Sequence, residues 1–203
     1  LFNYTRRASS VAHIGAIDLG GDNPIRIQSM TTTNTNDTEA CVRQAEEIIK
    51  AGGELVRFTT QGSREAENMK NINAGIRADG YQTPLVADVH FNPNVADVAA
   101  LYCEKVRVNP GNYVDPARKF IKQEYTDEEY AHELQKIEDR FVPFLNICKE
   151  HHTAIRIGVN HGSLSDRIRN RYGDTPEGIV ESCLEFLRIC KKENFHDVVI
   201  SIK

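Results

Sequence analysis

Six apolar runs of strand length recur along this chain, and each ends in polar or charged residues. The runs occupy 25–30, 55–59, 85–90, 106–110, 155–160 and 199–203. Segments with helical spacing of apolar residues separate successive runs. This alternation predicts a parallel sheet whose apolar face is covered by helices.

Polar side chains fall on one face of these strands, because side chains alternate between the two faces of a strand. The opposite face carries Val, Ile, Leu and Phe. In a doubly wound sheet helices cover both faces, and both faces are apolar. The pattern instead favours an α/β fold of the TIM-barrel type, (β/α)8, of which about six βα units are present. We expect the polar face to line the barrel interior.

The expected inward face is rich in cations. It carries Arg57 with Thr59, Asp88 with His90, Arg107 with Asn109, Arg156 with Asn160, and Ser201 with Lys203. Four cations against one evident carboxylate leave an excess of positive charge. Buried cations are unfavourable unless an anion meets them. Since guanidinium groups bind phosphate oxygens in pairs, the pattern predicts a site for a diphosphate or a similar polyanion.

Asp88 and His90 admit more than one interpretation. Asp88 can pair with a neighbouring arginine while His90 hydrogen-bonds to it, or the two can bind a hydroxyl group or transfer a proton. They could also begin a metal site, although no third ligand is apparent. Asn109 and Asn160 each open a run of turn-forming residues, and their amides could bind ligand oxygens.

Two further segments stand out near these strands. Arg167, Arg169 and Arg171 form a basic run, which we interpret as a solvated helix face, with a docking surface for another domain as the alternative. The stretch between Gly111 and Thr126 is longer than an ordinary loop from strand to helix. It is therefore a candidate active-site segment.

Composition limits the classes of partner. The 203 residues are 40% hydrophobic and suffice for one globular domain spanning 1–203. A formal net charge of −4 argues against nucleic acid or an anionic membrane as the main partner. No stretch approaches the ~18 apolar residues of a membrane span, and we expect a cytoplasmic protein. The five cysteines lie far apart without a Cys-x-x-Cys pair, which indicates reduced, buried thiols.

The ends of the sequence add two expectations. Apolar runs at 11–14 and 16–19, flanked by glycine, predict a β-hairpin ahead of the first parallel strand. The chain begins with Leu1 and stops at the end of a strand, and six strands do not close a barrel of eight. We therefore expect the N-terminal part of a larger protein.

Five segments, taken together in order and spacing, resemble the hydroxymethylbutenyl diphosphate synthase family, also called GcpE. The likeness is to the larger form found in plants and some bacteria. The segments are Ile27–Thr31, Leu55–Arg57, Pro84–Phe91, Arg107–Asn112 and Ile155–Leu164.

This resemblance implies a function. The family reductively opens 2-C-methyl-D-erythritol 2,4-cyclodiphosphate to 4-hydroxy-3-methylbut-2-enyl diphosphate in non-mevalonate isoprenoid biosynthesis. By resemblance, the residues that hold the diphosphate are Arg57, Arg107, Arg156, Asn160 and Lys203. Asp88, His90 and Asn109 would line the same pocket.

The resemblance also implies a cofactor and partners. The family's chemistry takes place at a [4Fe-4S] cluster bound in a C-terminal domain. The partner subunit of a homodimer supplies this domain to the barrel, and flavodoxin or ferredoxin is the reductant. We find no match to that domain here, assign no catalytic or metal-binding residue, and expect the 203 residues alone to be inactive.

Two alternatives remain at this point. A pterin-binding barrel of the dihydropteroate synthase type would need aromatic or apolar pocket walls, whereas the inward residues here are cationic. A non-catalytic docking barrel would have its inward arginines neutralised by protein carboxylates.

Overall fold

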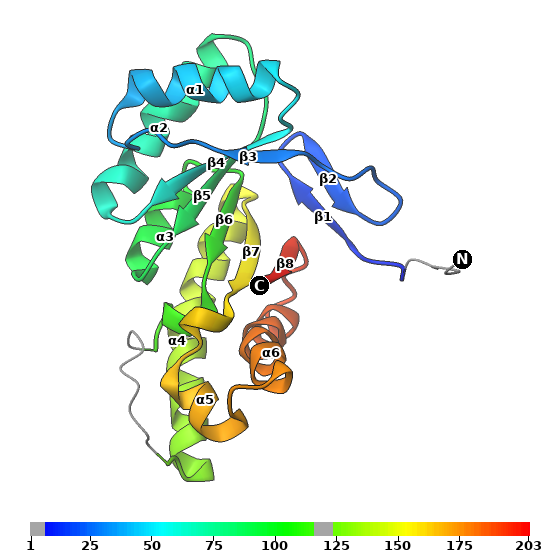
Figure 1. Cartoon of the computed structure of the whole chain (residues 1–203), viewed down its shortest axis with the longest axis vertical. Coiled ribbons are helices and arrows are strands. Elements are labelled where there is room, and N and C mark those ends of the chain that lie inside the picture. The colour runs from blue at the N-terminus through cyan, green and yellow to red at the C-terminus, as the bar shows by residue number, and fades with distance from the viewer. Residues whose placement is uncertain (1–6, 116–123) are drawn as a thin grey trace.

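A parallel sheet forms the centre of the computed structural model, which describes residues 7–115 and 124–203. Its strands are β3 (Gln28–Met30), β4 (Leu55–Thr60), β5 (Leu85–Val89), β6 (Lys105–Val108), β7 (Ala154–Val159) and β8 (Val198–Ile202). Each strand pairs in parallel with the next one along the chain (Figure 1). A doubly wound sheet reverses its strand order, whereas this order advances steadily, as in a (β/α)8 barrel. The curled sheet confirms the predicted barrel type.

Helices connect the strands, and several begin next to a side chain that caps them. They are α1 (Thr38–Lys50), α2 (Ser63–Ala78), α3 (Pro93–Ala100), α4 (Asp127–His151), α5 (Asp166–Tyr172) and α6 (Pro176–Lys192). The Thr126 hydroxyl accepts a hydrogen bond from the Glu129 amide, and the Thr175 hydroxyl accepts one from Gly178. Such caps satisfy amide groups that have no partner inside the helix. The short helix α5 contains Arg167, Arg169 and Arg171, the basic run that was interpreted as a helix face.

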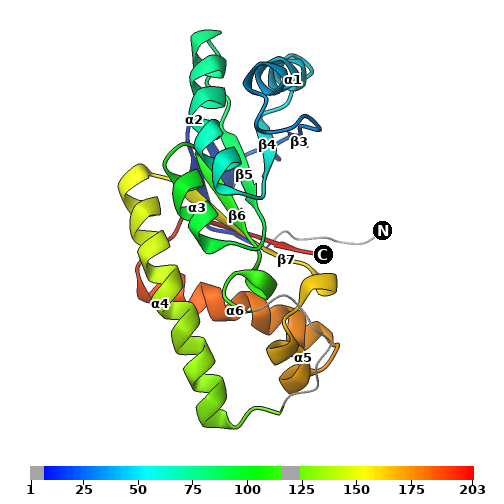
Figure 2. The ribbon, with the colours of Figure 1, turned by 90° about the vertical axis from the view of Figure 1, so that its left-hand side faces the viewer.

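The main core lies between the helices and the outer face of the sheet. Phe58, Ala87, Val106 and Ile157 point to this face and are fully buried. Figure 2 shows α3 and α4 on this side of the strands. The predicted covering of the apolar face is thus confirmed for β4 to β7. At the edges of the sheet, Ile27, which precedes β3, and Ile200 of β8 remain 60% and 55% exposed.

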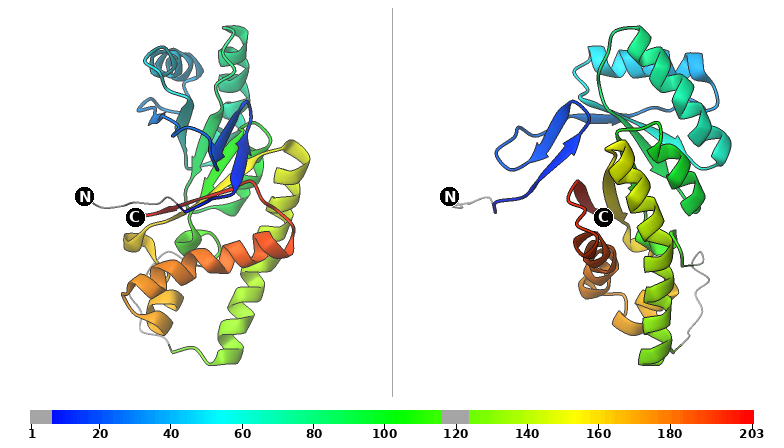
Figure 3. Two further views of the ribbon diagram at one scale, coloured as in Figure 1. Left: turned by 90° about the vertical axis from the view of Figure 1, so that its right-hand side faces the viewer. Right: turned by 180° about the vertical axis from the view of Figure 1, so that it is seen from behind.

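A hairpin closes the amino-terminal end of the sheet interior. Its strands β1 (Val11–Ile14) and β2 (Ile17–Gly20) are antiparallel, as predicted, and Figure 3 shows the hairpin on the side of the sheet opposite to α4. A second, small core consists of Ile14, Leu55, Val86 and Ala154. We call these four residues the floor. Because Leu55 and Ala154 open their strands, the floor lies at the end of the sheet from which the strands start.

A further observation concerns membranes. Among the helices formed by residues 7–115 and 124–203, none has the length and apolar character needed to cross a bilayer.

Candidate anion-binding site

Three guanidinium groups share the inner face of the sheet beyond the floor. Arg57 comes from β4, Arg107 from β6 and Arg156 from β7. The register places Arg107 directly beside Arg156 on one side and beside Asp88 of β5 on the other. We call Arg57, Arg107 and Arg156 the arginine tier. Their common direction follows from strand alternation and confirms the predicted inward placement.

Asp88 holds two members of this tier in place. Its side chain is 1% exposed. Arg57 Nε donates to Asp88 Oδ2 at 3.0 Å, Arg107 Nη1 donates to Asp88 Oδ1 at 3.1 Å, and His90 Nε2 lies 3.4 Å from Oδ2. Burial raises the pKa of this carboxyl, but hydrogen bonds from His90 and Arg57 and the charge of Arg107 outweigh burial and hold the pKa well below its usual range. Asp88 is therefore ionised at neutral pH, and the interpretation that it pairs with neighbouring arginines is confirmed.

Arg156 differs from its two neighbours in having no carboxylate partner among the described residues. Its Nη2 donates to Ser201 Oγ at 2.7 Å. Burial and the like charges of Arg57 and Arg107 lower the pKa of this guanidinium. An arginine nevertheless stays charged in proteins, so Arg156 presents positive charge to the interior without a carboxylate paired to it among residues 7–115 and 124–203.

Gly158 allows Arg107 to lie across the neighbouring strand. A Cβ at this position would come within 2.4 Å of Arg107 Nε, and the Gly158 carbonyl accepts a hydrogen bond from Arg107 Nη2 at 2.9 Å. The absence of a side chain at 158 thus contributes to the placement of the guanidinium.

Lys105 is a further inward cation that the sequence prediction does not include, because the predicted strand begins at Val106. The residue is 2% exposed, and its Nζ donates to Gln28 Oε1 at 3.3 Å. Burial and the charges of Arg156 and Arg57 lower the pKa of Lys105 to about 8. Its position two residues before Arg107 was the available signal, because alternation puts both on one face.

The two asparagine turns form a rim at the carboxyl ends of β6 and β7. Asn109 Oδ1 accepts from the Gly111 amide at 3.1 Å, and Asn160 Oδ1 accepts from the Gly162 amide at 3.0 Å. Asn109 Nδ2 also donates to Ser163 Oγ at 2.8 Å, which ties one turn to the other. The side chains of Asn109 and Asn160 therefore stabilise the turns that these residues open. Binding of ligand oxygens by Asn109 and Asn160 stays a prediction.

Lys203 follows β8 beside this rim. Its amide donates to the Val159 carbonyl at 3.1 Å, and its carbonyl accepts from the His161 amide at 2.8 Å. The side chain shares its face with Ser201 and is exposed. A direct role in ligand binding stays a prediction for Lys203.

The prediction of a solvated basic helix face is wrong for Arg167. This residue is 3% exposed and donates to both Asp115 and Glu185, with Arg167 Nη2 lying 3.0 Å from Asp115 Oδ2 and 2.7 Å from Glu185 Oε2. The Tyr130 hydroxyl donates to Glu185 Oε1 at 2.6 Å. The two carboxylates thus compensate the buried charge of Arg167. They connect α5 to α6 through Glu185, and to the segment after the Asn109 turn through Asp115. Arg169 and Arg171 do form surface ion pairs, as expected of an exposed face.

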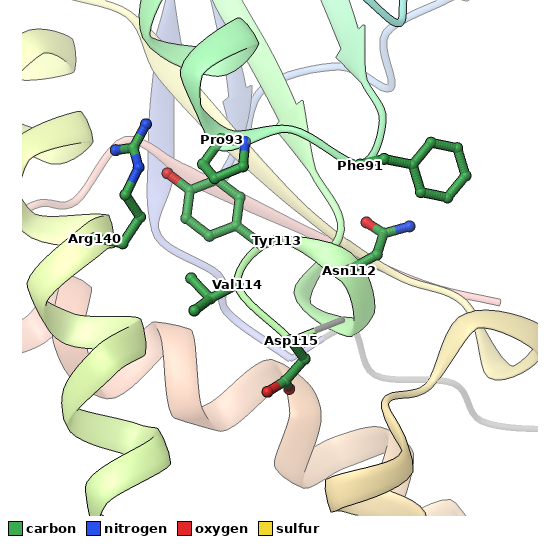
Figure 4. Close-up of a pocket in the computed structure, with 7 residues that line it drawn as sticks. All are labelled: Phe91, Pro93, Asn112, Tyr113, Val114, Asp115 and Arg140. Carbon is green, nitrogen blue, oxygen red and sulfur yellow. The ribbon is translucent and has the colours of Figure 1, made fainter. Parts of the chain in front are cut away.

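A cavity of about 340 Å3 opens beside the rim, at the carboxyl ends of β5 and β6 (Figure 4). Phe91, Pro93 and Tyr113 contribute to its walls. Phe91 has a left-handed backbone, with φ of 61°, and its side chain is exposed. The candidate segment between Gly111 and Thr126 contributes to this cavity through its first residues, while 116–123 lie outside the described residues.

The cysteines do not fit an iron-sulfur cluster. All five are free, buried thiols, and burial raises the pKa of Cys183 to about 11 and that of Cys190 to about 12. Cluster ligands must be thiolates, which such sites disfavour. Within the described part of the chain, no group of three or more His, Cys, Asp or Glu side chains could hold a metal ion. The described cysteines therefore provide no ligand set for such a cluster.

Comparison with known proteins places this chain in a family. A family model described as "GcpE TIM-barrel domain" matches residues 9–203. A protein of Phocaeicola vulgatus named 4-hydroxy-3-methylbut-2-en-1-yl diphosphate synthase (flavodoxin) is 76% identical over 203 residues, which make up all of this chain and 33% of that protein. A protein of the same name from Akkermansia muciniphila is 50% identical over 202 residues, covering 100% of this chain and 34% of its own length. The chain thus spans about a third of the length of the curated relatives it matches.

Solved structures support the fold alone. A truncated 3-deoxy-D-arabino-heptulosonate 7-phosphate synthase from Thermotoga maritima superposes with a TM-score of 0.58 at 9% sequence identity. The match covers 95% of this chain and 56% of that one. At this identity the likeness concerns the arrangement of strands and helices.

Proposed function

Because this chain belongs to the GcpE TIM-barrel domain family, we propose that it is the substrate-binding barrel of an enzyme that reductively opens 2-C-methyl-D-erythritol 2,4-cyclodiphosphate to 4-hydroxy-3-methylbut-2-enyl diphosphate. The observation that supports this most is Arg156, a partly buried guanidinium that faces inward without a carboxylate partner in the described parts of the chain. The family match decides against the pterin-binding alternative. The charge excess argues against the docking barrel, which requires neutralised arginines.

The arginine tier suits a cyclic diphosphate. Each phosphorus of this ligand carries an ionised oxygen, and guanidinium groups bind such oxygens through two parallel N–H donors. Asp88 already holds Arg57 and Arg107 in fixed positions, so less side-chain freedom is lost when the anion binds. Arg156 supplies a charge that is not paired with a carboxylate of the described residues.

The rim residues are proposed to contact the rest of the ligand. His90 follows β5, two residues after Asp88, and Asn109 and Asn160 open the turns after β6 and β7. Imidazole and amide groups can hydrogen-bond hydroxyl and phosphate oxygens. We assign hydroxyl or diphosphate contacts to these three residues and to Lys203.

The electron-transfer parts of the reaction are proposed for the whole protein. A [4Fe-4S] cluster, when bound by a partner subunit's domain in a homodimer, supplies the electrons that remove the hydroxyl group, and flavodoxin or ferredoxin delivers them. The relatives' names mention flavodoxin. On this proposal residues 1–203 act as one substrate-binding domain in the cytoplasm and do not turn over substrate alone.

Substituting Arg156 with methionine in the full-length protein tests the proposed ligand. The change removes one charged hydrogen-bond donor but leaves no protein carboxylate unpaired, so the fold should be little affected. Calorimetric titration with the cyclodiphosphate should show a loss of about 1.5–3 kcal/mol, a Kd that rises about 10- to 150-fold. Arg188→Met serves as the control, because Arg188 pairs with Glu181 on the exposed face of α6. Equal binding by wild type and Arg156→Met would refute the assignment.

A further inference from the structure

Lys105 occupies a position where its neighbours on the inner face are apolar. The register places it between Val86 of β5 and Ala154 of β7, and both of these residues belong to the floor. A leucine or methionine would continue that apolar layer. A lysine there must bury its ammonium, which is unfavourable without a counter-charge.

The surroundings of this ammonium supply no counter-charge. In the described chain its sole side-chain partner is the neutral Gln28 of β3. The charged groups facing the interior around it are Arg57 on β4, Asp88 on β5, Arg107 on its own strand and Arg156 on β7. Asp88 is already shared by Arg57 and Arg107. Lys105 therefore adds a charge to a group of guanidiniums that is itself under-compensated.

We propose that Lys105 is a further binding residue for the anionic ligand. The Lys105 ammonium supplies positive charge from between the floor and the arginine tier, and its protonation is coupled to anion binding. This inference rests on the proposed function. Without the anion, burial and the neighbouring arginines lower the pKa of Lys105 to about 8. A bound diphosphate reverses the sign of the local field, so that the protonated form is favoured and a proton is taken up.

The coupling predicts a specific pH dependence. At about pH 7 the ammonium is mostly formed, whereas at about pH 9 only about a tenth of it is protonated before binding. The affinity for the cyclodiphosphate should therefore fall about tenfold between these two values. The ligand does not contribute to this change, because each of its phosphorus atoms carries a single acidic oxygen that is ionised throughout the range.

The test uses the full-length protein and calorimetric titration with the cyclodiphosphate at about pH 7, 8 and 9. Titrations at about pH 8 in two buffers of different ionisation enthalpy should report uptake of up to about half a proton on binding. Lys105→Met should bind more weakly at about pH 7 and should lose both the proton uptake and the tenfold fall. Lys50→Met, which removes an exposed lysine paired with Glu46, should behave as wild type.

Thermal unfolding without ligand gives a second readout. Lys105→Met should unfold at a higher temperature than wild type at about pH 7, because a buried and uncompensated charge is removed. If Lys105→Met unfolds at a lower temperature, Lys105 is paired with a protein carboxylate and the inference is overturned. If wild type binds the cyclodiphosphate with no pH dependence that Lys105→Met removes, the inference fails while the proposed function stands. If wild type does not bind it at any of these pH values, both fail.

Discussion

Replacing Asp88 with asparagine is expected to lower the free energy of unfolding by about 3 kcal/mol at neutral pH. Removing one partner of a buried ion pair typically costs about 3–5 kcal/mol, because the remaining charge is left uncompensated. The lower end applies here, since the side chains of Arg57 and Arg107 keep 25% and 13% of their exposure to solvent. Equilibrium unfolding in denaturant measures the loss.

The pH dependence of this loss identifies its cause. The folded-state pKa of Asp88 lies well below the value of about 3.9 in an unfolded chain. Its contribution is therefore complete above about pH 4 and declines as the pH falls towards the folded-state pKa. The difference between wild type and Asp88→Asn should shrink in acid, whereas Asp22→Asn, at an exposed position, should show no such difference. A small and pH-independent difference for Asp88→Asn would contradict the assigned ion pairs.

The second large effect is expected at Arg167, away from the ligand site. Arg167→Met leaves the buried carboxylates of Asp115 and Glu185 without their cation, and we expect a loss of about 3–5 kcal/mol in the free energy of unfolding. Unpaired buried carboxylates titrate above their unfolded-state values, so the variant should recover part of the loss as the pH is lowered from about 7 to about 5.

Two comparisons test this account of Arg167. Adding Asp115→Asn and Glu185→Gln to Arg167→Met removes the uncompensated charges and should restore part of the stability. Arg169→Met changes a surface ion pair and should cost no more than about 1 kcal/mol. Similar small losses for Arg167→Met and Arg169→Met would show that the buried network contributes little.

The inner face of the sheet could be predicted from sequence because strand alternation is a local property. Arg57, Arg107 and Arg156 recur at matching places in their strands, and the structure brings them together as expected. Lys105 obeys the same rule but opens its strand, where a lysine is easily taken for a solvated residue. Its burial results from the hairpin that covers the starting ends of the strands, which is a tertiary effect.

Arg167 could not be placed from its neighbours in the sequence. Its two partners lie 52 and 18 residues away, and a basic run of three arginines suggests a solvated helix face. The burial of a guanidinium depends on whether distant carboxylates reach it, which spacing alone does not reveal. The same limit applies to Asp88, whose pairing was one of several open interpretations until the geometry of both arginines was known.

A crystal structure of the full-length protein with the bound cyclodiphosphate tests the central claim most directly. The account predicts that diphosphate oxygens lie within hydrogen-bond distance of Arg57, Arg107 and Arg156, with Asp88 still bridging the first two. It also predicts that Arg156 has no carboxylate partner in the ligand-free crystal. A ligand bound away from the inner face of the sheet, or a protein carboxylate paired with Arg156, would contradict it.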